Sequence, residues 1–140
     1  MLPTDSSQLS KAAIQKGVQF AKSINAKVTG LYVMPEFHAV TYKTEIPGDA
    51  GEKFAKDCRA YADQFLSVVE EAAKASGVVC DIALATSDHP YEAIIKAAEE
   101  KSCDLIMMAS HGRKGVEGLS LGSETHKVLM HTKIPVLVCR

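Results

Sequence analysis

The sequence carries little net charge and no long apolar run. Its formal net charge of −1 at pH 7 gives no electrostatic reason to expect nucleic acid or an anionic membrane as a partner. No apolar run approaches the roughly 20 residues that cross a bilayer, and the N-terminus lacks the basic region and apolar core of a signal peptide. We therefore expect a soluble, cytoplasmic protein with neither nucleic acid nor a membrane among its partners.

The cysteines lack the spacing of a metal or redox site. No C-x-x-C motif and no Cys/His pairing at zinc spacing occurs, and the four residues are Cys58, Cys80, Cys103 and Cys139. Each lies in or beside an apolar stretch, so we expect reduced thiols that pack as small hydrophobic side chains. A redox switch is the alternative. We expect no metal site built from protein residues alone.

Catalytic motifs are absent as well. The five histidines, at positions 38, 89, 111, 126 and 131, form no H-E-x-x-H helix, and no G-x-S-x-G turn offers a serine nucleophile. Neither of the familiar phosphate-binding motifs, G-x-x-x-x-G-K-[ST] and G-x-G-x-x-G, is present. The sequence nominates no catalytic residue and does not decide whether the protein is an enzyme.

The chain does contain an alternation of strand-like and helix-like segments. Its length of 140 residues suits one domain, residues 1–140, with a core of its own. Apolar runs predict strands, and apolar residues at helical spacing predict helices. The strands are expected at 27–33, 78–85, 105–109 and 134–139, and the helices at 7–25, at 50–76 and after Pro90. This order predicts an α/β fold whose parallel sheet has helices on both faces.

The two longer helices each carry an apolar stripe that we expect to face the core. We expect the aromatic residues of the second stripe to be core residues rather than cofactor contacts. The stripes are Leu9, Ala13, Gly17, Phe20 and Ile24 in the first helix, and Phe54, Cys58, Tyr61, Phe65, Val68 and Ala72 in the second.

The first residues pose a problem for such a sheet. Met1, Leu2 and Pro3 look like the tail of an apolar strand, and proline has no N–H to donate to a central ladder. Losing a central strand would leave several backbone groups unpaired at about 1–3 kcal/mol each, against a total stability of about 5–15 kcal/mol. We therefore expect that upstream residues are missing from this sequence, or that another segment or chain supplies the strand.

A glycine-bearing loop follows the strand-like run at 105–109. Its glycines permit backbone conformations that other residues avoid, and Ser123 is a good N-cap for the helix that follows. Unpaired N–H groups and the positive end of the helix dipole should gather at that helix start, and such a place attracts phosphate. The glycines are Gly112, Gly115, Gly118 and Gly122.

This loop resembles the nucleotide-binding motif of the universal stress protein family. The matching residues are Ala109-Ser-His-Gly112, nine further residues, Gly122-Ser123 and, after a helix, Ile134-Pro-Val-Leu-Val138. Pro3-Thr-Asp5-Ser-Ser resembles the family's first loop, and the resemblance covers nearly the whole chain. One position departs from the pattern, because the family's first glycine is Ala109 here. The resemblance implies an adenine-nucleotide alpha-hydrolase-like fold: an open five-stranded parallel sheet in the order 3-2-1-4-5, with a truncated first strand.

By the same resemblance, the binding residues come from loops at the carboxyl ends of the strands. Asp5 is expected beside the ribose or the phosphate-bound metal, and the backbone of Val33 at the adenine edge. Main-chain N–H groups around Gly112, Gly122 and Ser123 are expected to do most of the binding, with help from the Ser123 hydroxyl. The full expected set is Pro3, Thr4, Asp5, Val33, Met108, Ala109, His111, Gly112, Arg113, Gly115, Gly122, Ser123, Glu124 and Thr125.

Side chains are expected to tune this binding. Arg113 and Lys114 are the cations of the loop, available to neutralise a triphosphate or simply solvated. Glu124 suits the helix dipole but repels phosphate, so it should point outward if nucleotide binds. His111 either holds the loop by a hydrogen bond, which we favour, or approaches the phosphates.

The resemblance implies a stress-response protein that binds ATP, together with the Mg²⁺ that accompanies ATP, as a switch or sensor. Hydrolysis should be absent or slow, because no general base or water-positioning residue is visible. The apolar C-terminal strand Ile134–Cys139 is expected to form a homodimer by edge pairing. Two alternatives stay open: a nucleotide-free homodimeric module, because of Ala109, and an ATP-pyrophosphatase-type enzyme, whose S-G-G-x-D-S loop is replaced here by Pro3-Thr-Asp-Ser-Ser.

Overall fold

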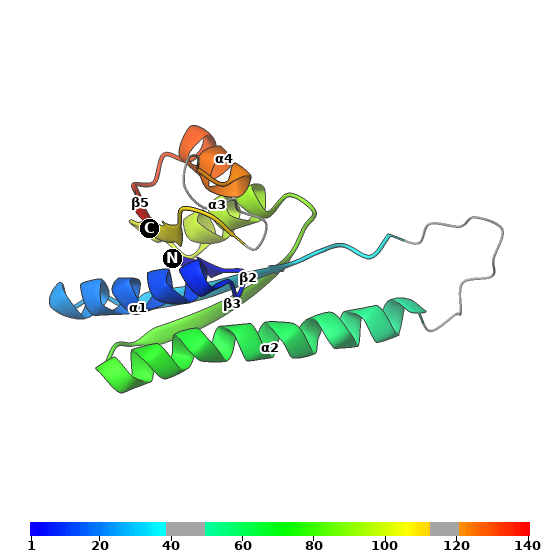
Figure 1. The fold of residues 1–140 in the computed structure, drawn as a ribbon, viewed down its shortest axis with the longest axis horizontal. Helices are drawn as coiled ribbons and strands as arrows, with labels where there is room; N and C mark the ends of the chain where they lie inside the picture. The colour runs from blue at the N-terminus through cyan, green and yellow to red at the C-terminus, as the bar shows by residue number, and fades with distance from the viewer. Residues whose placement is uncertain (39–49, 113–120) are drawn as a thin grey trace.

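The structure is a computed structural model that describes residues 1–38, 50–112 and 121–140. Strands and helices alternate along the chain (Figure 1). Every pair of neighbouring strands is parallel, so the predicted α/β class is confirmed. Among the described residues, no helix is long and apolar enough to cross a membrane. The elements are β1 (Leu2–Thr4), α1 (Gln8–Ser23), β2 (Val28–Met34), α2 (Ala50–Ser76), β3 (Cys80–Thr86), α3 (Pro90–Glu100), β4 (Ile106–Ala109), α4 (Ser123–His131) and β5 (Val136–Cys139).

The five strands pair in two groups rather than in one continuous ladder. The first group has the order β1-β2-β3, and the second consists of β4 and β5. The groups meet at the first residue, because the Met1 nitrogen donates to the Leu105 carbonyl at 2.7 Å and the Met107 N–H donates to the Met1 carbonyl at 2.9 Å. The predicted order 3-2-1-4-5 thus agrees with the strand neighbours inside each group. β1 and β4 also lie side by side, but in the described residues they form no ladder, and the hydrogen bonds between the groups are those of Met1.

Pro3 of β1 contributes to this division. β1 covers three residues, with Leu2 beside Gly30, Pro3 beside Leu31 and Thr4 beside Tyr32. Pro3 has no N–H and therefore cannot donate toward β4. β2 and β3 are longer, with seven residues each, and β3 lies at the edge of its group.

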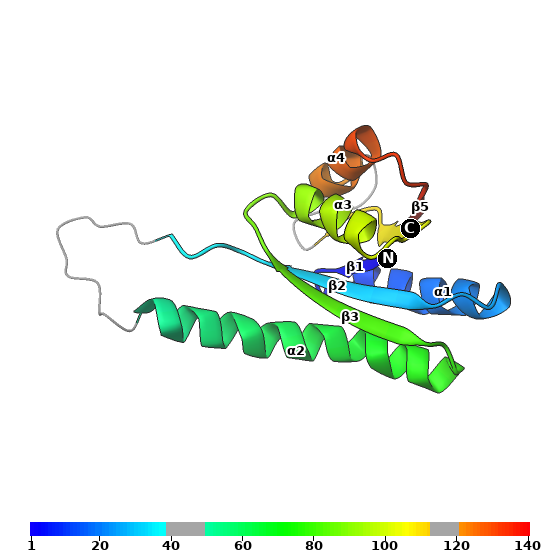
Figure 2. The same ribbon diagram turned by 180° about the vertical axis from the view of Figure 1, so that it is seen from behind.

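Helices cover both faces of the strands. Figures 1 and 2 show α1 and α2 on one side of the strands and α3 and α4 on the other. The side chains of β4 alternate accordingly: Met107 and Ala109 belong to the buried cluster that contains α1 and α2 residues, and Ile106 and Met108 to the cluster that contains Ile94 and Val128. The core therefore has two halves, one on each face.

The predicted helical stripes are partly wrong in orientation. Leu9 and Phe20 of α1 are exposed, as is Ile24 at its C-cap, and on α2 Tyr61 is 57% exposed. Small and branched residues take the core-facing positions because the helices pack close to the strands. The buried residues are Ser10, Ala13, Ile14, Gly17, Val18 and Ala21 on α1, and Ala62, Leu66, Val69, Ala72 and Ala73 on α2.

Gly30 of β2 provides a test of this close packing. A methyl group on Gly30 would lie 3.1 Å from three side-chain carbons of Val69, and a β-branched valine has little freedom to move away. We expect Gly30→Ala to lower the free energy of unfolding by about 1–3 kcal/mol, measured by urea denaturation.

The matched control is Gly51→Ala. A methyl group there would make only ordinary contacts, at 3.7 Å from Phe37, and alanine favours helix. An equal loss of stability in both variants would contradict the packing explanation.

Candidate functional site

A cleft opens at the carboxyl ends of the strands, where loops from both groups of strands meet. Its volume is about 660 Å³, within the range of roughly 300–1,000 Å³ typical of small-molecule sites. The ends of β1, β2 and β4 form its floor, and the first turn of α4 forms part of its wall. This is the place where ligands bind in open α/β folds.

The cleft brings together the predicted site residues that the structure describes. Arg113 and Gly115 lie outside the described residues, as does Lys114. The predicted residues that line the cleft are Pro3, Thr4, Asp5, Val33, Met108, Ala109, His111, Gly112, Gly122, Ser123, Glu124 and Thr125. The prediction missed eight further lining residues, which are Ser10, Leu31, Tyr32, Pro35, Ser87, Asp88, Pro90 and Ile94.

The loop after β1 is held by its own side chains. The hydroxyls of Thr4 and Ser10 are 2.8 Å apart, and Ser7 caps α1 by accepting a hydrogen bond from the Ser10 N–H at 3.1 Å. Asp5 accepts from the Ser7 N–H through Oδ1 at 3.0 Å, which fixes the orientation of its carboxylate. The other oxygen, Oδ2, lies 2.5 Å from the place where a Cβ on Gly112 would sit. Any side chain at position 112 would therefore displace Asp5.

The start of α4 differs from the prediction in two respects. The N-cap is Gly122, and Ser123 is the first helical residue. The Gly122 N–H donates to the Ser110 carbonyl at 2.7 Å, so this N–H is already used and is not available to a ligand. A Cβ on Gly122 would lie 3.2 Å from the Cα of His111 and from the carbonyl oxygen of Ser110. Glycine is thus required here because two backbone segments touch.

Thr125 and Glu124 anchor α4 to its neighbours. The Thr125 hydroxyl donates to the Ala109 carbonyl at 2.9 Å and is buried, which ties the helix to the end of β4. Glu124 accepts from the Tyr91 N–H at 2.9 Å and from Lys127 at 2.9 Å. The Glu124 carboxylate is therefore engaged with the N-terminus of α3, where negative charge is favourable, although the residue still lines the cleft.

His111 has one bonded and one open ring nitrogen. Its Nδ1 lies 3.0 Å from the hydroxyl of the preceding residue, Ser110. Its Nε2 is buried and has no hydrogen-bond partner among the described residues. Buried polar atoms are normally satisfied, so Nε2 is a candidate contact for a ligand in the cleft.

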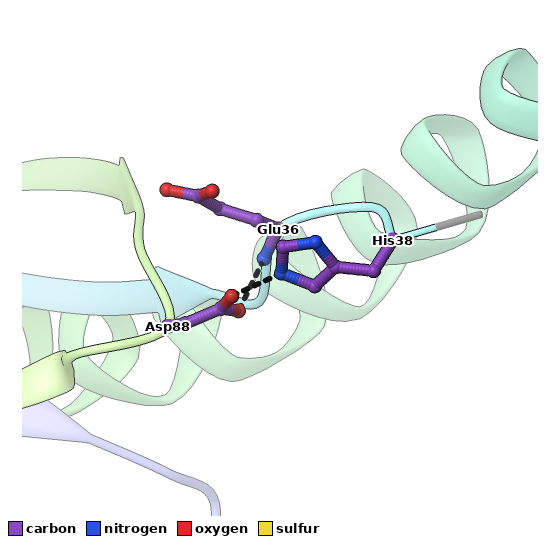
Figure 3. Close-up of side chains that lie close together, drawn as sticks. All are labelled: Glu36, His38 and Asp88. Carbon is purple, nitrogen blue, oxygen red and sulfur yellow. Dashed lines mark hydrogen bonds and ion pairs between the residues drawn. The ribbon is translucent and has the colours of Figure 1, made fainter. Parts of the chain in front are cut away.

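A second group of polar side chains lies at the rim of the cleft, on the side of β2 and β3. Figure 3 shows His38 facing Asp88, with Glu36 next to them. Nε2 of His38 is paired with Oδ2 of Asp88, and the Glu36 N–H donates to Oδ1 of Asp88 at 3.0 Å. The hydrogen bond to Asp88 raises the pKa of His38 above its ordinary 6.5, and the same bond lowers the pKa of Asp88 below its ordinary 3.8.

Sequence reasoning missed this group because its members are distant in the chain. The signal that could have found it is strand pairing. β2 and β3 run in register, with Met34 beside Thr86, and the Ser87 N–H donates to the Met34 carbonyl at 2.9 Å. Residues that follow two paired parallel strands emerge side by side, which places Glu36 and His38 next to Asp88.

The comparisons with known proteins decide the family. The model of the universal stress protein family matches residues 1–140. The chain belongs to the universal stress protein family. One relative, universal stress protein MJ0531 of Methanocaldococcus jannaschii, is 28% identical over 141 residues, which cover 100% of this chain and 80% of the relative. The resemblance seen in the sequence is thereby confirmed at the level of the family.

Solved structures show the same fold. Protein MJ0577 of Methanocaldococcus jannaschii has a TM-score of 0.82 at 24% identity, covering 99% of this chain and 92% of that one. A universal stress protein solved in complex with cAMP has a TM-score of 0.67 at 27% identity, covering 99% and 94% of the two chains. The adenine-nucleotide ligand of the latter belongs to that protein.

The pairing of His38 with Asp88 predicts a pH dependence. We expect the His38 ring to titrate above pH 6.5, the ordinary value, and Asp88→Asn to return the midpoint toward that value because the charge is lost. The protonated His38 ring, paired with Asp88, stabilises the folded state. This stabilisation is complete below the unfolded-state pKa of His38 and disappears as the pH rises through its raised, folded-state pKa.

NMR of the histidine ring protons over the pH range 4 to 9 would measure these midpoints. Asp88 contributes to stability at the other end of the pH range. Its contribution to the stability of the folded state is present above the unfolded-state pKa of the carboxyl and is lost as the pH falls through the lowered, folded-state pKa. Identical His38 midpoints in the native protein and in Asp88→Asn would show that the pair does not form in solution.

Proposed function

We propose that this protein is a cytoplasmic stress-response protein that binds ATP with a divalent cation in the cleft and acts as a switch or sensor. The observation that carries this proposal is the cleft itself, because it collects residues from the first loop, the end of β2 and the glycine-bearing loop. The similarity to a family member solved with cAMP supports an adenine nucleotide as the ligand class.

The cleft residues suit the parts of such a ligand. The first-turn N–H groups of α4, at Ser123 and Glu124, have no acceptor within the helix and would bind phosphate oxygens, together with the Ser123 hydroxyl. Gly122 allows the start of α4 to pack directly against the backbone of Ser110 and His111. The backbone of Val33 would meet the adenine edge, and Asp5 would lie beside the ribose or the cation that accompanies ATP.

The same residues give no reason to expect fast hydrolysis. His111 is the only titratable side chain of the glycine-bearing loop that the structure describes, and its Nδ1 is engaged with Ser110. Rapid phosphoryl transfer needs a residue that positions the attacking water and cations that stabilise the transition state. We therefore propose binding and switching, with hydrolysis slow or absent.

Titration with ATP and Mg²⁺ by calorimetry tests the nucleotide proposal. We expect saturable binding by the native protein and none by Gly122→Val, because the valine side chain would collide with the backbone of His111 and Ser110, whose atoms lie 3.2 Å from the Cβ position. Circular dichroism checks that the variant folds, and Gly51→Ala serves as a glycine substitution outside the cleft. No heat of binding and no thermal shift at millimolar ATP would reject the proposal that the protein binds ATP. ATP turnover at about 1 s⁻¹ or faster would reject the proposal that hydrolysis is slow.

Ala109 keeps a second candidate open, a homodimeric module that binds no nucleotide. Ala109 lines the cleft, yet it is only 8% exposed and belongs to the core cluster on the α1 side. Its methyl group is therefore largely covered by protein. In the same titration, Ala109→Gly should leave the affinity of a competent site nearly unchanged, whereas a large gain in affinity would show that the alanine obstructs the cleft.

We propose in addition that the protein forms a homodimer through β5. Among the described residues β5 pairs with β4 alone, and Leu137 of β5 is 42% exposed. An unpaired apolar strand edge favours pairing with a second copy. We expect Leu137→Lys to convert a dimer to a monomer in sedimentation equilibrium.

Ile82→Lys is the matched control for the dimer. Ile82 is 44% exposed on β3, the strand at the other edge. A native monomer at micromolar concentration, or dissociation by Ile82→Lys but not by Leu137→Lys, would exclude β5 as the interface.

A further inference from the structure

The Glu36, His38 and Asp88 group is not explained by nucleotide binding. Only Asp88 of the three lines the cleft, and all three side chains are exposed. Their potential ligand atoms lie within 4.8 Å of one another. Two carboxylates and an imidazole, brought from two segments about 50 residues apart in sequence, are a metal-ligating combination.

The group is partly organised before any ion arrives. The Glu36 N–H holds Oδ1 of Asp88, so that Oδ2 is presented to the His38 ring, as Figure 3 shows. Such backbone hydrogen bonds to a carboxylate orient metal ligands. Glu36 thus contributes twice, with its backbone to the orientation of Asp88 and with its own carboxylate as a possible ligand. Its exposed side chain can rotate toward the pair.

We propose that Glu36, His38 and Asp88 bind one divalent transition-metal ion, with Zn²⁺ as the reference ion, at the rim of the cleft. One nitrogen and two carboxylate ligands favour Zn²⁺ and its transition-metal neighbours over Mg²⁺ and Ca²⁺, which prefer oxygen ligands alone. Three protein ligands leave at least one coordination position for water or for another ligand.

The bound ion would have a structural consequence. It would join the segment after β2 to the loop between β3 and α3, and both segments contribute to the cleft through Pro35 and Asp88. This ion is distinct from the cation that accompanies ATP, because its ligands lie on the β2 and β3 side, whereas the phosphate-binding backbone belongs to β4 and α4. The proposal does not depend on nucleotide binding.

Calorimetric titration of the chelator-stripped protein with Zn²⁺ tests the proposal. We expect one site per chain in the native protein. His38→Ala and Glu36→Gln should each weaken Zn²⁺ binding by about tenfold or more, since each removes a ligand. His126→Ala, which removes another exposed histidine, should leave the affinity unchanged. Equal affinity in the native protein and His38→Ala, or no binding at all, would overturn the proposal.

Co²⁺ absorption separates this site from the cysteines, three of which are partly exposed. Cobalt bound by nitrogen and oxygen gives only weak visible bands, whereas cobalt bound by thiolate adds an intense near-ultraviolet band. We expect the first spectrum, and we expect binding to weaken as the pH falls through the pKa of His38, because the proton competes with the metal. A thiolate spectrum that persists in His38→Ala would assign the ion to cysteine and reject the site.

The variant Gly122→Val separates the Zn²⁺ proposal from the nucleotide proposal. It should lose ATP and retain Zn²⁺, and His38→Ala should lose Zn²⁺ while still binding ATP. Loss of Zn²⁺ binding in a folded Gly122→Val protein would contradict the placement of the ion outside the nucleotide cleft.

Discussion

Two hydrogen bonds at Met1 join the two groups of strands, and the cleft lies across that junction. Met1 bonds to Leu105 and Met107 of the β4 side, while the next three residues pair with β2. Cleft residues come from both sides, with Thr4 and Val33 from one group and Met108 from the other. The shape of the cleft therefore depends on how firmly this junction is held.

Helix α1 reinforces the junction from one face. Gly17 sits over it so closely that a Cβ would lie 2.5 Å from a Leu2 side-chain carbon and 3.3 Å from the Met107 sulfur. One residue of one helix therefore contacts a strand from each group. Close packing at this position adds to the two hydrogen bonds of Met1, each of which contributes about 0.5–1.5 kcal/mol net. The same contacts place Ser10 and the first loop at the cleft.

The order of elements, and the gathering of the predicted loops around one cleft, could be predicted from the sequence because both follow from short-range patterns. Strand and helix periods are local, and the loops after parallel strands must gather at one edge. The orientation of the helices was harder. Phe20 and Tyr61 fit the apolar period of their helices but lie outside the core, because close helix packing favours neighbours such as Ala21 and Ala62. Their periodicity alone contains no information on how near the strands are.

Two features of the site also required coordinates. The Gly122 N–H was expected to bind a ligand, and it is instead used by Ser110, a contact between backbone segments that no side-chain pattern encodes. The pairing of Glu36 and His38 with Asp88 requires the register of β2 and β3. Each of these depends on a tertiary contact between residues well separated along the chain, and such contacts cannot be read from spacing.

The acidic residues of the cleft favour the proposal that the nucleotide arrives with a cation. Among the described lining residues Asp5, Asp88 and Glu124 are acidic, and none is lysine or arginine. Asp88 is paired with His38 and Glu124 with Lys127, which offsets much of their effect on a phosphate. For the Asp5 carboxylate, the scale of the repulsion is that two unit charges of like sign 4 Å apart repel by about 4 kcal/mol at an effective dielectric constant of about 20. Helix α4 offsets only part of this repulsion, since a helix dipole contributes about 0.3–1 kcal/mol at an exposed end. A divalent cation between Asp5 and the phosphates would turn that carboxylate from a repulsive neighbour into a ligand, so the acidic first loop favours the metal complex of ATP over free ATP.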